Sequence, residues 1–211
     1  MSETVLTLVR HGETTWNAEG RIQGHLDVPL SATGLAQAAA IGRRLGGHSF
    51  DAILSSDLER AMQTARPIVR HSEQTIVPDA RLRERHLGVL QGLTGEEAAI
   101  RQPHAWAVFK ARNPEAALEA GETLGQFSQR VVRLLEELLR AYSGSRLLLV
   151  THGGVLDAAY RHATGMPLNA LRDFPIYNVS VNVLRHCDGV WAIESWGDIS
   201  HLRQELAMDD T

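Results

Sequence analysis

The sequence places a cation, an imidazole and a glycine directly after a short apolar run near its N-terminus. Residues 5–9 are typical of a buried strand, and Arg10, His11 and Gly12 follow them. A neutral imidazole is a good nucleophile near neutral pH, and a guanidinium offers a planar fork of donors that fits phosphate oxygens. Because glycine lacks a Cβ, the backbone at Gly12 can lie close to a ligand. These residue types together favour attack on phosphorus, although so short a motif also recurs by chance.

A second imidazole follows a second apolar strand much later in the chain. Residues 146–151 form the clearest buried-strand pattern, and His152 and Gly153 come next. Polar loops beyond the carboxyl ends of parallel strands are the usual ligand sites of open α/β sheets, so both rings can share one crevice. This repetition is the main reason within the sequence to favour catalysis by His11 over a histidine that only satisfies a hydrogen bond.

Three further segments carry polar side chains that could line the same crevice. Residues 15–30 form a long loop without regular periodicity, and loops of this length are often functional. Arg60 lies in the first turn of a helix predicted over 58–71, with Asp57 as its cap, where it would face the same edge of the sheet. Glu84 is flanked by two arginines and could be a general acid or a partner in a surface ion pair. The loop contributes Asn17, Arg21 and Gln23.

Strands and helices alternate along the chain, which predicts a three-layer α/β/α sandwich on a mostly parallel central sheet. Residues 177–185 and 190–196 alternate between apolar and polar side chains around a turn, which predicts a C-terminal hairpin at the edge of the sheet. Asp198 and His201 follow this hairpin and are expected on the surface. The remaining expected elements are helices over 35–45, 122–142 and 155–164, and strands over 50–56 and 74–78.

A single domain is expected over residues 1–211, with one segment that interrupts its alternating pattern. Residues 95–121 are polar and irregular, with short helical pieces broken by Pro103 and Pro114. We interpret this segment as a lid over the crevice that influences the choice of substrate. Its candidate substrate contacts are His104, Trp106, Lys110 and Arg112.

The composition narrows the class of protein. The chain has 211 residues, of which 44% are hydrophobic, enough for one full core. Its 21 basic and 25 acidic residues give a formal net charge of −4, which argues against a nucleic-acid binder. Cys187 is the only cysteine, and the chain shows neither a leader pattern nor a long apolar run, so a cytoplasmic protein without membrane contact is expected. The histidines lack the spacing of metal ligands, so no metal is expected.

With these residues in view, the chain resembles the histidine phosphatase superfamily, whose members include cofactor-dependent phosphoglycerate mutases and many small-molecule phosphatases. The matching segments cover most of the chain. Each segment is moderately specific, and their order and spacing together are highly specific. The segments are Arg10 to Thr14 with Asn17, Gly20 to Gly24 with Asp27 to Leu30, Ser55 to Ala61, Leu82 to Glu84, and Thr151 to Gly153.

The resemblance implies a role for each matching polar residue. His11 would take the phosphoryl group, while Arg10, Arg60 and His152 would bind its oxygens and offset charge in the transition state. Glu84 would protonate the leaving oxygen and later help water attack the phosphohistidine. This scheme needs no metal and no cofactor. The residues expected to bind the phosphate also include Asn17, Gln23, Gly24 and Gly153.

The same phosphoenzyme could belong to a phosphatase or to a mutase. Mutases that resemble this chain have a lysine in place of Gly95, an arginine pair where Arg101 and Arg112 stand apart, and an asparagine in place of Gly154. Fewer cations would hold a bisphosphate less tightly and leave the phosphoenzyme more open to water, so we favour a phosphatase for a small phosphorylated metabolite.

Two alternatives stay open at this point. One is a phosphoglycerate mutase that depends on 2,3-bisphosphoglycerate, which would then be its cofactor. The other is a module that binds a phospholigand without catalysis, since a fold alone does not give activity. The sequence identifies neither the physiological substrate nor the oligomeric state, although the edge hairpin could pair two copies in a homodimer.

Overall fold

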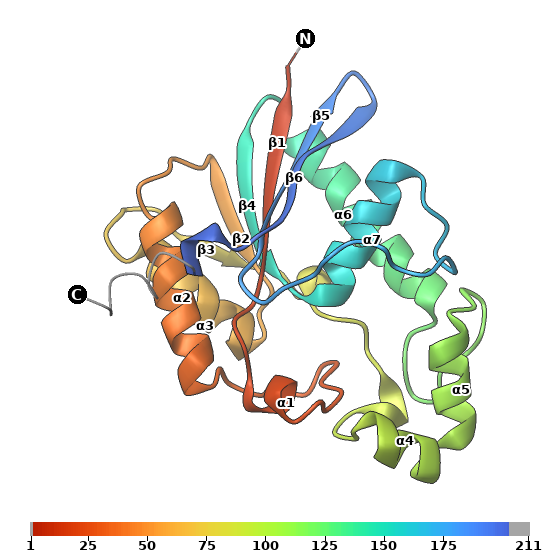
Figure 1. Cartoon of the computed structure of the whole chain (residues 1–211). Helices are drawn as coiled ribbons and strands as arrows, with labels where there is room; N and C mark the ends of the chain where they lie inside the picture. Colours follow the sequence, from red (N-terminus) through yellow and green to blue (C-terminus); the bar gives the residue numbers. More distant parts are fainter. Residues whose placement is uncertain (1, 203–211) are drawn as a thin grey trace.

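The structure is a computed structural model that describes residues 2–202. Its centre is a six-stranded sheet with the order β3-β2-β4-β1-β5-β6 (Figure 1). The first four strands of the chain run parallel, and the last two form an antiparallel hairpin at one edge, as predicted. The strands are β1 (Thr4–Arg10), β2 (Ala52–Ser55), β3 (Ile76–Pro78), β4 (Arg146–Thr151), β5 (Val181–Cys187) and β6 (Val190–Asp198).

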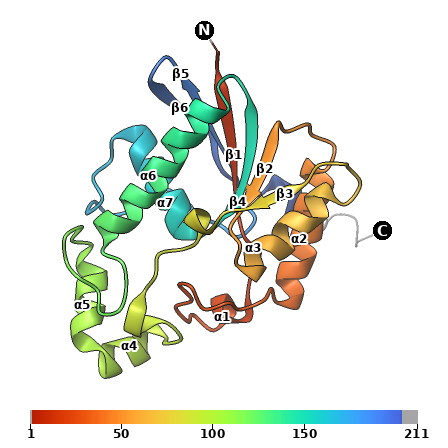
Figure 2. The same cartoon turned by 180° about the vertical axis from the view of Figure 1, so that it is seen from behind.

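Helices cover both faces of the sheet, which confirms the predicted three-layer sandwich (Figures 1 and 2). Two helices pack on one face, and two pack on the other, so that the long helix α6 crosses behind the strands in one view and in front of them in the other. The first pair is α2 (Ala32–Leu45) and α3 (Glu59–Val69), and the second is α6 (Leu124–Ala141) and α7 (Gly153–Thr164).

The central strand β4 shows why the sheet is covered on both faces. Leu147 and Leu149 belong to the apolar cluster under α6 and α7, whereas Leu148 and Val150 belong to the cluster under α2 and α3. Successive side chains of a strand point to opposite faces, so a continuous apolar run requires two covering layers. All four side chains are fully buried, and each burial stabilises the fold by about 1.5–3 kcal/mol.

Two local expectations for the first half of the chain need correction. Residues 15–30 are not wholly irregular, because α1 (Thr15–Ala18) forms one helical turn that Thr14 caps. Asp57 does not cap α3, whose N-cap is Leu58 without a side-chain bond. The carboxylate of Asp57 instead forms a bidentate ion pair with Arg83, at 2.7 and 2.6 Å. A charged partner close in space therefore replaces the local capping interaction.

The segment predicted as a lid lies beyond the carboxyl ends of the parallel strands, apart from the sheet (Figure 1). It contains α4 (Gly95–Arg101) and α5 (Pro103–Ala111), and Pro103, the first residue of α5, separates the two short helices as predicted. Two short 3₁₀ turns, η1 (Ala80–Leu82) and η2 (Gly88–Leu90), lead from β3 toward it. The lid and the segment around η2 share a small apolar cluster, formed by Leu87, Leu90, Ala98, Ala105 and Leu118.

The residues after the hairpin are less exposed than expected. His201 has an exposed fraction of only 7%, and its Nδ1 lies 3.0 Å from an amino group of Arg44 on α2. Arg44 also forms an ion pair with Asp198. The prediction of two surface groups is therefore wrong for His201, because a cation from a distant helix packs against this segment.

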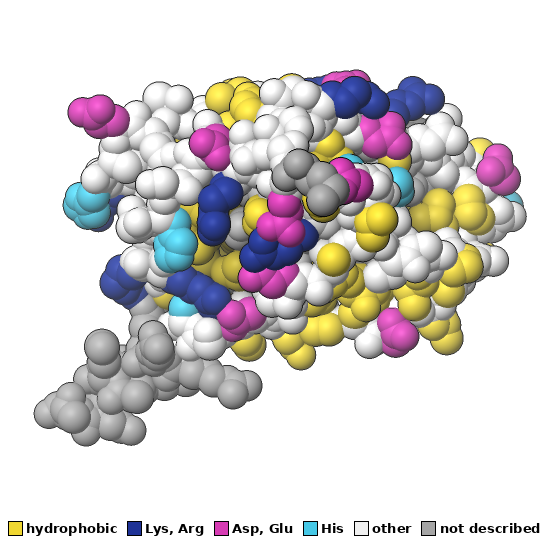
Figure 3. All heavy atoms as spheres, turned by 90° about the horizontal axis from the view of Figure 1, so that it is seen from above, with side chains coloured by type: hydrophobic (Ala, Val, Ile, Leu, Met, Phe, Trp, Pro, Cys, Tyr) yellow, Lys and Arg dark blue, Asp and Glu magenta, His cyan; other side chains and the backbone are white. Residues whose placement is uncertain are grey.

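The face at the amino ends of the parallel strands lies opposite the lid. Basic and acidic side chains are interspersed on it, with apolar side chains between them (Figure 3). Across residues 2–202, no helix has the length and apolar character that crossing a membrane requires.

Candidate active site

The two predicted histidines lie side by side because the central strands end in register. Arg10 of β1 pairs with Thr151 of β4, and the N–H of His11 donates to the Thr151 carbonyl at 2.8 Å. His11 and His152 are the next residues of the two strands, and their ring centroids are 5.1 Å apart. The structure thus brings together the two rings that the sequence repetition places in one crevice.

The ring of His11 is buried and has a defined tautomer. Its Nδ1 lies 2.7 Å from the Gly12 carbonyl, which can only accept, so Nδ1 carries the proton and Nε2 has a free lone pair. Burial is the main reason that the pKa of His11 lies well below its usual value, and Arg60 and Arg10 lower it further. His11 is therefore neutral near pH 7 and chemically suited to act as a nucleophile.

The ring of His152 is held on both sides. The Nε–H of Arg60 donates to Nδ1 of His152 at 3.2 Å, so the proton of the neutral ring lies on Nε2, which donates to the Ser56 hydroxyl at 2.8 Å. Burial lowers the pKa of His152 well below its usual value, and Arg60 and His11 add to the effect. Ser56 was not among the predicted site residues, although it lies in one of the segments that carry the family resemblance.

Two buried guanidinium groups flank the histidines. Arg60 at the start of α3 donates to the carbonyls of Leu26 and Gly24 at 2.8 and 2.7 Å, and burial lowers its pKa to about 10. Arg10 donates to the Ile176 carbonyl at 2.8 Å, while its buried Nε has no hydrogen-bond partner within residues 2–202. A buried cationic donor without a partner is costly in free energy, so this arrangement favours an anionic ligand.

A cavity of about 170 Å³ opens between these cations and the loop after β1. Asn17 lines the cavity, and its Oδ1 accepts the N–H and the hydroxyl of Thr14, both at 3.1 Å, which leaves its amide nitrogen as the donor for a ligand. At Gly24 the backbone has a φ of +53°, and a Cβ there would lie 2.1 Å from the side-chain Oε1 of Gln91. The predicted residues that line this cavity are Arg10, His11, Asn17, Arg21, Gln23, Gly24, Arg60 and Glu84.

Glu84 lies at the border of this cavity. Its two carboxylate oxygens accept the backbone N–H groups of Arg85 and Gly154, both at 2.8 Å. The second of these groups belongs to the first turn of α7, where negative charge is favoured. A Cβ at Gly154 would lie 2.0 Å from a Glu84 oxygen, so the glycine makes this position of the carboxylate possible. Both carboxylate oxygens of Glu84 are thus bonded to backbone N–H groups at the border of the cavity, rather than to a surface cation.

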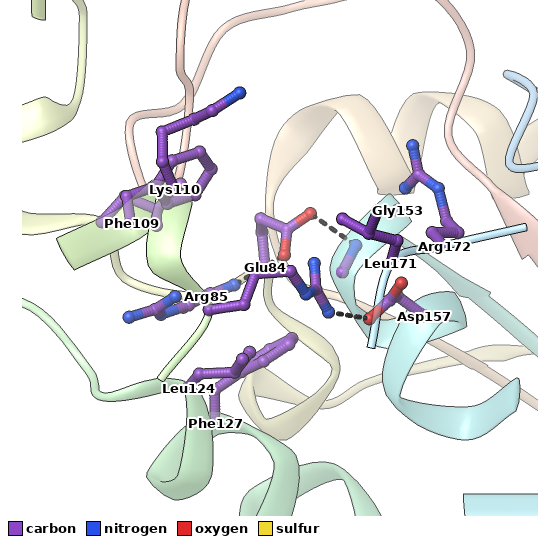
Figure 4. A pocket seen from close by; sticks show the side chains of 13 residues that line it. Glu84, Arg85, Phe109, Lys110, Leu124, Phe127, Gly153, Asp157, Leu171 and Arg172 are labelled. Atoms are coloured by element: carbon purple, nitrogen blue, oxygen red, sulfur yellow. Dashed lines mark hydrogen bonds and ion pairs between the residues drawn. The ribbon is translucent and has the colours of Figure 1, made fainter. Parts of the chain in front are cut away.

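A second cavity of about 480 Å³ adjoins the first, and Glu84 and Leu87 line both. Figure 4 shows Glu84 between the end of α5, with Phe109 and Lys110, and the segment after α7, with Leu171 and Arg172. Arg112 also lines this cavity and donates to Asp157 at 2.9 Å and to the Leu168 carbonyl at 3.0 Å.

Of the four lid residues predicted to contact the substrate, only two line the second cavity. Lys110 and Arg112 line it, whereas His104 and Trp106 do not. Trp106 instead packs on Phe109, with ring centroids 5.5 Å apart. Predicted Gly153 lines this larger cavity rather than the smaller one, and a Cβ there would lie 3.5 Å from Nε of Arg10. Leu171 and Arg172 were missed, because they lie in a segment without helical or strand periodicity.

Residues 6–199 match the model of the histidine phosphatase superfamily (branch 1), and the chain belongs to this superfamily. A solved relative has the same fold over nearly its full length. Bacillus stearothermophilus YhfR superposes with a TM-score of 0.87 at 34% identity, over 94% of this chain and 99% of that one.

Two curated relatives from Arabidopsis thaliana carry names that correspond to the two activities considered above, phosphatase and mutase. One is named metal-independent phosphoserine phosphatase and is 44% identical over 94% of this chain and 83% of its own length. The other is named phosphoglycerate mutase-like protein 4 and is 40% identical over 94% of this chain and 87% of its own length. These similarities support the predicted histidine phosphatase, with a mutase as the alternative.

Proposed function

We propose that this protein hydrolyses a small phosphomonoester through a phosphohistidine on His11. The observation that carries the proposal is the neutral His11 ring, whose Nε2 lone pair faces a cavity walled by two buried guanidinium groups. A phosphate dianion in this cavity would supply the partner that the buried Nε of Arg10 lacks.

Each neighbouring side chain has a place in binding the phosphoryl group. Arg60 uses three donors to hold the 24–26 loop and His152, and a guanidinium has five, so two are left for phosphate oxygens. Asn17 adds a neutral donor through its amide nitrogen, and Gln23 and Gly24 complete the wall. Preorganised donors of this kind stabilise the charge of the transition state.

The reaction then runs in two balanced steps. His11 Nε2 attacks phosphorus, the bond from phosphorus to the leaving oxygen breaks, and protonated Glu84 gives that oxygen its proton. Water next attacks the phosphohistidine while Glu84 accepts a proton from it, and the bond from phosphorus to nitrogen breaks. Inorganic phosphate leaves, and His11 and Glu84 return to their starting states. The position of Glu84 between the two cavities suits both steps.

The larger cavity would receive the alcohol part of the substrate, and the 95–121 lid would influence its choice. The cavity combines apolar side chains with the cationic groups of Lys110 and Arg172, which fits an organic group that carries a further anion. Phosphoserine is such a compound, and it is the substrate in the name of the relative with 44% identity. We also infer a single domain and a cytoplasmic location from the sequence, and the edge hairpin is a surface through which two copies could pair.

A mutase is the second candidate, because another relative is named mutase-like. The deciding experiment incubates the purified protein with 3-phosphoglycerate, with and without 2,3-bisphosphoglycerate, and in parallel with phosphoserine. We expect inorganic phosphate without 2-phosphoglycerate. Rapid isomerisation that depends on the bisphosphate would instead identify a mutase. If neither product forms from these compounds, a panel of other phosphomonoesters tests the chemistry, and failure on all of them would refute a phosphatase.

A further inference from the structure

Glu84 lies in a stretch of backbone that neither a helix nor the sheet holds in place. Residues 84–87 have no regular secondary structure and connect η1 to η2. A general acid must lie within hydrogen-bond reach of the leaving oxygen, and a misplacement of 1 Å can lower a rate about 100-fold. Some other interaction must therefore fix the backbone of Glu84.

The guanidinium group of Arg130, on the long helix α6, binds this stretch. It donates to the carbonyls of Arg81, Arg83 and Glu84 at 2.7, 3.0 and 3.2 Å. It also lies over the ring of Phe127, 5.0 Å from the centroid, which fixes the plane of the group. One cation on a rigid helix thus joins three carbonyls of the segment that carries the acid.

Glu122 holds the guanidinium in the correct orientation. Its two oxygens accept from Nε and Nη2 of Arg130, each at 2.9 Å, in a bidentate pair. One of these oxygens also accepts the backbone N–H of His86 at 2.8 Å. Burial raises the pKa of Glu122, but the bonds from Arg130 and His86 outweigh it and lower the pKa overall, so the carboxylate is charged at neutral pH.

A second donor, from the loop after β1, reaches the same carbonyl. His25, in the loop after β1, lies with its Nε2 2.7 Å from the Glu84 carbonyl oxygen. The Glu84 carbonyl oxygen is thus held by the imidazole of His25, in the loop after β1, and by the guanidinium of Arg130. The side chain of Glu84 then only has to reach from a fixed backbone to the edge of the cavity.

We propose that Arg130 and Glu122 form a clamp that positions Glu84 for proton transfer to the leaving oxygen. Neither residue lines the cavities, so both are positioning residues rather than catalytic residues. The inference rests on the proposed function, because it assumes that Glu84 is the general acid. It assigns to two charged residues outside the site an effect on one step of the reaction.

The experiment compares substrates whose leaving groups differ in their need for a proton. 4-Nitrophenolate leaves readily without protonation, whereas the phenolate of phenyl phosphate needs more help from an acid. We expect Arg130→Gln to lower kcat/KM for phenyl phosphate about 10- to 100-fold. The same variant should lower kcat/KM for 4-nitrophenyl phosphate less than about threefold. The matched control is Arg133→Gln, because Arg133 is an exposed arginine of the same helix. It should leave both values unchanged.

Glu84→Gln separates failure of the clamp from failure of the proposed function. Glu84→Gln should give the same selective loss, since it removes the acid itself. Suppose that Glu84→Gln lowers kcat/KM selectively for phenyl phosphate, whereas Arg130→Gln lowers kcat/KM equally for both substrates or for neither. The clamp is then refuted. If Glu84→Gln is itself not selective, the proposed role of Glu84 fails, and the clamp fails with it.

A milder variant covers the case in which Arg130→Gln does not fold. Glu122→Gln keeps the bonds from Arg130 to the three carbonyls and removes only the charge that orients the guanidinium. It should give a selective loss of about 3- to 10-fold. An equal loss on both substrates, or none, would show that the pair has only a structural role.

Discussion

The two adjoining cavities of this protein are built in different ways. The smaller cavity is lined by groups at a strand end and at the start of α3 and by the loop after β1, and its two key side chains, His11 and Arg60, are buried and bonded to the backbone. The larger cavity takes its side chains from the end of α5, the start of α6 and the segment after α7. Leu171, at its border, has an exposed fraction of 86%.

The difference separates chemistry from recognition. The smaller cavity depends on a strand ladder that fixes His11 and His152, so its geometry follows from the fold itself. The larger cavity depends on side chains at the ends of helices and in the segment after α7, which can change without disturbing the sheet. We therefore expect substitutions in the smaller cavity to affect all substrates alike, and substitutions in the larger cavity to affect substrates differently.

The largest expected effect comes from the nucleophile. His11→Ala should lower kcat more than about 1000-fold on every phosphomonoester, because no other group can form the phosphoenzyme. Steady-state phosphate release on several substrates measures this. The circular dichroism spectrum should stay unchanged. Residual turnover that differs strongly between substrates would show that the smaller cavity also selects among them.

A substitution at the border of the two cavities should have an intermediate effect. The Cβ of Gly154→Ala would lie 2.0 Å from a Glu84 oxygen and would displace the carboxylate, so kcat/KM for phenyl phosphate should fall about 10- to 100-fold. Gly47→Ala is the matched control, since a Cβ there meets no atom within 4 Å. Unchanged kinetics for Gly154→Ala would mean that Glu84 does not need its bond to α7.

The burial of both histidines makes the stability of the protein dependent on pH. Their pKa values lie well below 6.5 in the folded state, mainly through burial, whereas in the unfolded chain they are near 6.5. Below pH 6.5 the unfolded chain binds protons that the folded protein does not, so stability falls as the pH falls. Above that pH the contribution is fully present.

Urea denaturation between pH 7 and pH 5 measures this effect. Each histidine should lower the free energy of unfolding by up to about 1.4 kcal/mol per pH unit below pH 6.5. His11→Asn should remove the share of one ring from the slope. A slope equal to that of the unchanged protein would contradict a neutral, buried His11.

The smallest expected effect lies in the larger cavity. Phe109→Ala should lower kcat/KM for 1-naphthyl phosphate about 10-fold, through lost apolar contact with the leaving group, and that for phosphoserine less than about threefold. Ile100→Ala, which changes an exposed lid residue, should change neither value. Equal losses on both substrates would remove the distinction between the two cavities.

The sequence predicts the smaller cavity better than the larger one for a physical reason. His11 and His152 follow apolar strands, and the register of parallel strands then brings them together. Arg60 follows the end of a strand in the same way, although an arginine in a helix is usually solvated and this one is buried. Local pattern and sheet geometry together determine these three positions.

The remaining errors come from contacts between residues far apart in the chain. Asp57 was expected to cap α3, but Arg83 binds its carboxylate. His201 was expected on the surface, but Arg44 packs against it. Leu171 lies in a segment with no periodicity, so no local pattern places it at a cavity. A single sequence does not indicate such distant partners, because their pairing depends on how the helices pack.

The lid and the segment around η2 share an apolar cluster, separate from the two clusters that cover the sheet. A bridge joins this cluster to the loop after β1, where Arg21 binds the Gly92 carbonyl and Glu97. Arg112 also joins the lid to the helix layer, because it binds Asp157 of α7 and the Leu168 carbonyl. For an enzyme engineer, the equivalent of residues 95–121 from a relative can therefore be grafted only together with the partners of Arg21 and Arg112; such a graft should change which alcohol is released and leave the two histidines in place.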